Sequence, residues 1–93
     1  MILSFAERET EKIWFGVRSR KLPPEMQNKA LVKLRFLNQA RRLDDLRVPP
    51  GNRLEALKGD RKGQYSIRIN DQWRIMLQVG QGRMSDVEIH DYH

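Results

Sequence analysis

The chain has 93 residues, and its 18 Lys and Arg against 12 Asp and Glu give a formal net charge of +6 at pH 7. This length predicts one domain, residues 1–93, whose modest core buries roughly 60–70% of the unfolded surface. The chain lacks cysteine, which excludes disulfides and thiolate metal sites, and no apolar run approaches the ~18 residues of a membrane span, so we expect a soluble, cytoplasmic protein.

The first predicted elements are a short strand and a helix. Residues 2–5 are apolar, which fits a first strand, and residues 7–15 fit a helix. Acidic residues early in this helix suit the positive end of its dipole, and Gly16 is placed to end it. The side chains expected to face the core are Phe5, Ile13, Trp14 and Val17.

A longer second helix is predicted from Pro23-Pro24 to about Ala40, after a basic loop over residues 16–22. Residues 41–47 fit one further helical turn, and the prolines of residues 48–52 predict a rigid loop. The apolar positions that recur at helical spacing are Ala30, Leu31, Leu34 and Leu37. The charged positions off this stripe, expected to form an ordinary solvated face, are Lys29, Lys33 and Arg35.

The second half of the sequence predicts strands joined by short turns. Residues 53–57 begin the sheet, and a glycine-bounded basic turn follows over residues 58–63. Alternating apolar residues mark strands over 65–69 and 73–79, and the three-residue loop between them fits a hairpin. A last strand has Val87 and Ile89 on its buried face. The chain order predicts an α+β fold, with two N-terminal helices packed on one face of a mostly antiparallel, four- to five-stranded sheet.

The hairpin register places two like charges across from each other. It sets Ile67 opposite Ile75 and Arg68 opposite Arg74. Opposed like charges destabilise a strand pair, and an anionic ligand between them would remove the conflict. The simpler alternative is that both side chains point into water. We expect Arg68, Arg74 and Lys58 on the face away from the helices.

The positive charge points to a polyanionic partner, with nucleic acid as the first candidate. An acidic protein, an anionic membrane surface and a basic but inert surface are the alternatives. Three classes of function follow: an enzyme that acts on nucleic acid, a non-catalytic RNA- or ribosome-binding module, and a structural partner of an acidic protein that binds no RNA.

The C-terminal residues admit three interpretations. His90 and His93 suggest a metal clip, but histidines three apart on a strand face opposite sides and no third ligand is evident, so no metal site is predicted. Alternatively, Asp91 and His93 exchange protons while Tyr92 stacks on a base or donates a proton. The third interpretation is an ordinary chain end without a role.

Three motifs occur together: Leu57-Lys58-Gly59-Asp60-Arg61, Trp73-Arg74-Ile75 and Asp91-Tyr92-His93. In this combination, and in its helix-then-sheet order, the whole chain resembles the HigB toxins of the RelE-like superfamily, which belong to bacterial type II toxin–antitoxin systems. The resemblance implies an endoribonuclease that cuts messenger RNA in the ribosomal A site and so inhibits translation. It also implies a helix-turn-helix antitoxin, HigA, through which the complex would bind operator DNA.

The matching motifs imply site residues. The catalytic candidates are Lys58, Arg68, Arg74, Asp91, Tyr92 and His93. The RNA-binding candidates are Lys58, Arg61, Lys62, Arg68 and Arg74. The sequence departs from the family where some members carry a histidine on the strand before the Leu-Lys-Gly motif, because Glu55 or a neighbour stands there.

These residue types suit RNA cleavage by the ribose 2′-hydroxyl without a cofactor. Such cleavage needs a base, positive charge for the phosphorane and an acid for the leaving oxygen, and cationic side chains supply the charge without a metal ion. Asp91 is predicted to be the base or to orient His93, with His93 as the leading proton donor. One geometric difficulty is that alternation from Ile89 places Asp91 and His93 on the helix side of the sheet. A bulge near His90, or an end to the strand there, is needed to re-aim them.

Overall fold

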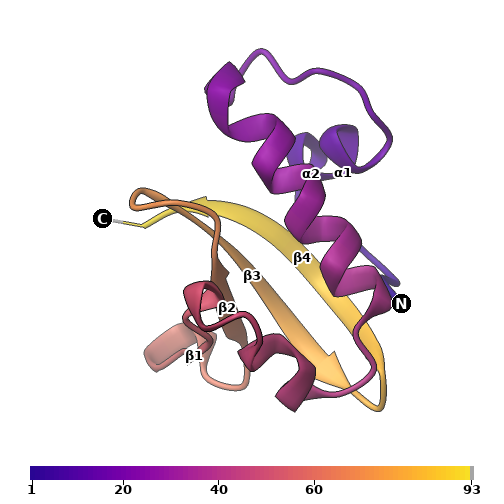
Figure 1. The fold of residues 1–93 in the computed structure, drawn as a ribbon, viewed down its shortest axis with the longest axis vertical. Coiled ribbons are helices and arrows are strands. Elements are labelled where there is room, and N and C mark those ends of the chain that lie inside the picture. Colours follow the sequence, from indigo (N-terminus) through magenta and orange to yellow (C-terminus); the bar gives the residue numbers. More distant parts are fainter. Residues whose placement is uncertain (93) are drawn as a thin grey trace.

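The computed structural model describes residues 1–92 (Figure 1). Within this range, two helices precede four strands, which confirms the predicted α+β fold. The helices and strands are α1 (Arg8–Trp14), α2 (Pro24–Gln39), β1 (Glu55–Ala56), β2 (Tyr65–Arg68), β3 (Trp73–Gly80) and β4 (Arg83–Asp91). Three short 3-10 helices between α2 and β2 are η1 (Leu43–Arg47), η2 (Pro50–Asn52) and η3 (Gly59–Arg61). No helix in the described range is long and apolar enough to cross a membrane.

The four strands form an antiparallel sheet in the order β1-β2-β3-β4. The hairpin between β2 and β3 has the predicted register, with Ile67 paired to Ile75. The predicted strand over residues 2–5 is reduced to two isolated parallel bridges beside β4. In these bridges the Leu3 N–H donates to the Met84 carbonyl at 2.7 Å, and the Ala6 N–H donates to the Val87 carbonyl at 2.9 Å.

The hydrophobic core lies between the helices and one face of the sheet, and Figure 1 shows α1 and α2 together on the β4 side. The predicted stripe of α2 faces this core, since Ala30, Leu34 and Leu37 are buried. Val17 was expected in the core, but its side chain is 52% exposed. The physical reason is that α1 ends at Trp14, so Val17 lies beyond the helix and off its apolar face.

The loop between the helices is held by buried hydrogen bonds around Ser19. The Ser19 N–H donates to Gln27 Oε1 at 3.0 Å, and Gln27 Nε2 donates back to the Ser19 carbonyl at 2.9 Å. The Ser19 hydroxyl donates to Glu9 Oε1 at 2.7 Å and, as the largest cause, lowers the pKa of Glu9. The basic loop predicted over residues 16–22 is therefore tied to both helices.

A β-bulge interrupts the long β3–β4 ladder. Met76 pairs with Glu88 and Gln78 pairs with Ser85, so Leu77 lies opposite the two residues Asp86 and Val87. The backbone of Asp86 is left-handed, with φ of 52°. An extra residue on one strand bends that strand and shifts the alternation of its side chains. The bulge therefore determines which side chains of β4 share a face with those of β3.

Candidate active site

Arg74 of β3 lies on the outer face of the sheet, the face turned away from α1 and α2. Its side chain is only 5% exposed, and charged groups are seldom buried unless they are paired. Nε donates to the Ser66 hydroxyl at 2.8 Å, and Nη2 donates to the carbonyls of Ser66 and Arg53. Nη1 lies 3.8 Å from the Glu55 carboxylate. Two carbonyls, a hydroxyl and an acid thus fix the orientation of this guanidinium.

Arg68 lies across the β2–β3 ladder from Arg74, which confirms the predicted pairing of the two arginines. Its guanidinium forms an ion pair with Asp71 in the hairpin loop. Each opposed arginine therefore has an acid beside it, Asp71 for Arg68 and Glu55 for Arg74. The alternative in which both arginines point into water is wrong, because Arg74 is buried. An anion between them stays a prediction.

Glu55 and Tyr92 lie together against Arg74. The Tyr92 hydroxyl donates to Glu55 Oε2 at 3.3 Å. The Tyr92 ring centroid is 5.2 Å from Arg74 Cζ, which is a cation–π distance. Glu55 and Tyr92 are both exposed, so a ligand can reach them from solvent. The sequence left the participation of Glu55 open, and the structure places it in contact with two predicted site residues.

These residues line an open cleft of about 190 Å³. The lining residues are Arg53, Glu55, Arg68, Asn70, Asp71, Arg74 and Tyr92. Arginines provide fixed positive charge and forked donors that match the oxygens of a phosphate. A carboxylate and a phenol beside them can exchange protons with a reacting group. The cleft therefore has the groups needed for acid–base chemistry at a phosphate.

Asp91 lies opposite Trp73 at the end of β4. Since paired residues share a face and Trp73 packs against the core, Asp91 belongs to the helix side of the sheet. Its carboxylate accepts a hydrogen bond from Gln72 Nε2 at 3.2 Å. A bulge near His90 was needed to turn Asp91 to the outer face. The bulge of β4 lies at Asp86, so Asp91 keeps its place on the helix side.

Of the predicted Asp91-Tyr92-His93 group, the described residue that reaches the cleft is Tyr92. The strand ends at Asp91, and the Tyr92 N–H donates to the Gln72 carbonyl at 2.6 Å. Alternation along β4 places Tyr92 on the outer face, the face of His90 and Arg74, and its ring lies beside Arg74. His93 lies outside the described residues, so its role as proton donor stays a prediction.

The predicted basic turn contributes no lining residue to the cleft in the described part of the chain. Lys58 and Lys62 flank η3 and are exposed. Arg61 is ion-paired with Glu88 on β4, with Nη1 3.2 Å from Oε1. Among the five predicted RNA-binding residues, the structure therefore brings together the two arginines of the hairpin and leaves the three cations of the turn outside.

Sequence reasoning missed the groups that hold Arg74. Ser66 had a signal, because it alternates with Arg68 along β2 and so shares its face. The contact of the Arg53 carbonyl with Arg74 had no sequence signal. It requires a left-handed backbone at Arg53, with φ of 46°, and a glycine, the residue that would have indicated this conformation, does not stand there.

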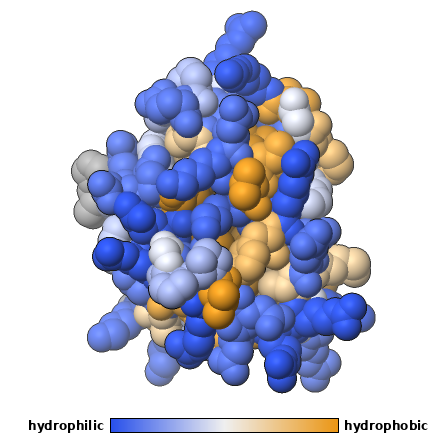
Figure 2. All heavy atoms as spheres, in the orientation of Figure 1, coloured by the Kyte–Doolittle hydropathy of each residue, from blue (hydrophilic) through white to orange (hydrophobic). Residues whose placement is uncertain are grey.

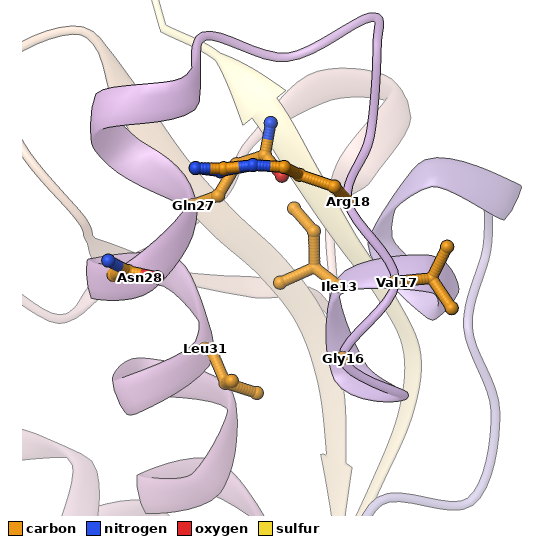
Figure 3. Close-up of a pocket in the computed structure, with 7 residues that line it drawn as sticks. All are labelled: Ile13, Gly16, Val17, Arg18, Gln27, Asn28 and Leu31. Atoms are coloured by element: carbon orange, nitrogen blue, oxygen red, sulfur yellow. The ribbon is translucent and has the colours of Figure 1, made fainter.

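A second cleft, of about 280 Å³, lies between the two helices and the loop after α1. Figure 3 shows the Arg18 side chain reaching across it toward Gln27, above Ile13 and Leu31. Figure 2 shows hydrophobic residues gathered over the same region, on a surface that is otherwise largely hydrophilic. Arg18 is the one charged residue that lines this cleft within residues 1–92, so it lacks the acid–base pair found beside Arg74.

Nearly the whole sequence matches one protein family. A model of the RelE-like toxin HigB of type II toxin–antitoxin systems matches residues 3–93. The chain belongs to this family. It is therefore a toxin of a type II toxin–antitoxin system, and its partner is an antitoxin.

Curated relatives and solved structures agree with this assignment. The HigB-family chain is 40% identical to Toxin HigB-1 of Vibrio cholerae over 79 residues, 84% of this chain and 83% of that protein. It is 27% identical over 81 residues to an uncharacterized protein of Haemophilus influenzae, covering 85% of this chain and 80% of that one. YafQ from E. coli shares the fold at 13% identity, with a TM-score of 0.64 over 98% of this chain and 91% of that one. A YoeB/ParE toxin from Agrobacterium tumefaciens shares this fold at 18% identity, with a TM-score of 0.57 over 99% of this chain and 98% of that one.

Proposed function

We propose that this toxin is a ribosome-dependent endoribonuclease that cleaves messenger RNA in the A site and so inhibits translation. The observation that carries the proposal is the environment of Arg74. A buried guanidinium, fixed by carbonyls and a hydroxyl, opens onto a cleft that also holds a second arginine, an acid and a phenol. Membership of the HigB family supports the choice of substrate.

Arg74 and Arg68 would bind the scissile phosphate. In the free toxin their charges face Glu55 and Asp71, whose carboxylates stand in for the phosphate oxygens of a bound RNA. Charge-assisted bonds from guanidinium to phosphate are strong and directional. Because Arg74 is oriented before the substrate arrives, its charge stabilises the phosphorane without reorganisation. This arrangement supplies the positive charge of the transition state from side chains, and the proposed reaction is metal-independent.

The reaction is the attack of the ribose 2′-oxygen on the phosphorus, with loss of the 5′-oxygen of the next nucleotide. A base removes the 2′ proton, an acid protonates the leaving oxygen, and the products are a 2′,3′-cyclic phosphate and a free 5′-hydroxyl. Glu55 and Asp91 are the candidate bases, and Glu55 is the one that lines the cleft. Tyr92 and His93 are the candidate acids, and Tyr92 also offers a ring on which a base can stack. Asp91 would act directly or by orienting His93.

The remaining surface provides contacts to the larger substrate. Lys58, Arg61 and Lys62 would hold the RNA backbone beside the cleft, as non-specific, salt-dependent contacts. In the cytoplasm, a HigA-like helix-turn-helix antitoxin would bind the toxin, and the complex would bind operator DNA through the antitoxin.

The test is to incubate the purified toxin with ribosomes carrying a defined messenger RNA and to map the RNA ends. We expect cuts within the A-site codon that disappear when the nucleotide before the cut carries a single 2′-deoxy substitution, since the nucleophile is then missing. Cleavage of the 2′-deoxy substrate at the same position would refute the mechanism. Binding to the ribosome without any cut would instead support a non-catalytic RNA-binding module.

A further inference from the structure

Lys33 of α2 is not part of the solvated face predicted for it. Its ammonium donates to the side-chain carbonyl of Asn52, a residue that is completely buried. Burial, followed by the positive charges of Lys29 and Arg68, lowers the pKa of Lys33. The Lys33 ammonium is therefore turned toward the buried Asn52 side chain.

Both the oxygen and the nitrogen of the Asn52 side-chain amide form hydrogen bonds that hold the loop before the sheet. Its carbonyl accepts from Lys33, and its Nδ2 donates to the carbonyls of Leu46, at 3.3 Å, and Val48, at 3.4 Å. A buried amide that loses one partner leaves a polar group unsatisfied, which is costly. The Lys33 contact therefore helps to keep the loop over residues 46–52 in a single position against α2.

The residue after Asn52 provides the carbonyl that orients Arg74. Arg53 has a left-handed backbone, with φ of 46° and ψ of 58°, and its N–H donates to the Pro50 carbonyl at 3.1 Å. A non-glycine residue keeps such a conformation only when its surroundings hold it. Its carbonyl accepts the Nη2 bond of Arg74. A short chain of contacts thus runs from α2 through Asn52 and Arg53 to the buried guanidinium.

We propose that Lys33 is a positioning residue for Arg74: through Asn52 it holds the Arg53 carbonyl, which aims the guanidinium at the cleft. Lys33 itself lies outside the residues that line the cleft and touches the substrate at no step of the proposed reaction. The effect on the cleavage rate rests on the function proposed above. If Arg74 contacts the reacting phosphate, a displacement of about 1 Å costs on the order of 10²-fold in rate. The structural consequence can be measured without substrate.

The structural test measures hydrogen exchange of the Arg74 Nη2–H protons, the group that donates to the Arg53 carbonyl, by NMR in the full-length toxin. Lys33→Met keeps the aliphatic stem but removes the donor, and Lys33→Arg restores a donor. Lys29→Met is the matched control, because Lys29 carries the same charge one turn earlier on α2 and is exposed. We expect exchange of Arg74 to speed up roughly tenfold or more in Lys33→Met, and to recover in part in Lys33→Arg. Equal exchange in Lys33→Met and Lys29→Met would overturn the proposal.

The kinetic test measures single-turnover cleavage and ribosome affinity separately. Lys33→Met should cut roughly 10- to 100-fold more slowly with little change in affinity. Because Lys33 acts through Arg74, the double variant Lys33→Met/Arg74→Ala should be no slower than Arg74→Ala, whereas independent roles would add and would refute the proposal. If the wild type cuts no RNA while the exchange result holds, the proposed function fails and the positioning role stands.

Discussion

The contacts of Arg74 predict that Arg74→Lys will produce a folded toxin that binds ribosomes but cuts RNA slowly. Lysine keeps the positive charge, but its ammonium is a compact point charge without the planar fork of arginine. In the structure Nε, Nη1 and Nη2 have different partners, which are Ser66, Glu55 and the Arg53 carbonyl. One ammonium cannot reproduce these directions and also face a phosphate.

The expected magnitudes follow from this geometry. Loss of one preorganised donor to a transition state typically lowers the rate on the order of 10²–10³-fold, and we expect that loss for Arg74→Lys. Stability should fall by about 2 kcal/mol, because hydrogen bonds from a charged group to the Ser66 and Arg53 oxygens are lost in part. For a domain of this size, that change lowers the melting temperature by about 8–16 °C.

The assay compares single-turnover cleavage with ribosome binding at a temperature below the melting transition of every variant. Arg47→Lys is the matched control, because Arg47 is an ion-paired arginine that contributes no lining to the cleft and its Nε lies 3.2 Å from Asp44 Oδ1. We expect Arg47→Lys to cut within about threefold of the wild type, as an exposed ion pair contributes little. If Arg74→Lys also cuts at that rate, charge alone suffices and the argument from a fixed guanidinium is wrong.

Three further predictions concern the metal, the base and the buried serine. Cleavage should survive excess EDTA when free Mg²⁺ is held at the level that keeps ribosomes intact, and a specific need for Mn²⁺ would contradict the metal-free reaction. Glu55→Gln should slow single-turnover cleavage on the order of 10²-fold or more and more strongly than Asp91→Asn, whereas the reverse order would assign the base to Asp91. Ionised Glu9 has a lowered pKa, so its bond from Ser19 stabilises the fold above about pH 4.5 and is lost as the pH falls below that value. Ser19→Ala should therefore lower the melting temperature near neutral pH and approach the wild type in acid, and a gap that is constant with pH would contradict this assignment.

The sequence by itself determined the strands of the hairpin and their register. Apolar residues alternate with period two on both sides of a three-residue loop, and a shift of one residue would turn every apolar side chain to solvent. Ile67 therefore had to face Ile75, and Arg68 had to face Arg74. The apolar stripe of α2 was equally predictable, because its spacing follows the helical repeat and the buried area depends on it.

The tertiary structure decided which of these side chains form a site. Arg74 is buried and Arg68 is not, although both occupy equivalent positions in the alternation, because Arg53, Glu55 and Tyr92 contact the Arg74 guanidinium. These groups come from segments distant in sequence, and no local pattern relates them.

The ends of the strands were also decided by tertiary structure. The β4 bulge falls at Asp86 rather than near His90, so the alternation that starts at Ile89 continues to the end of β4. Asp91 therefore pairs with Trp73 on the helix side, and Tyr92 lies on the outer face beside Arg74. Bulge positions and left-handed residues such as Arg53 arise where packing and hydrogen bonds outweigh local backbone preference. The sequence therefore determined the residue types available to the site, and packing between distant segments determined which of them meet.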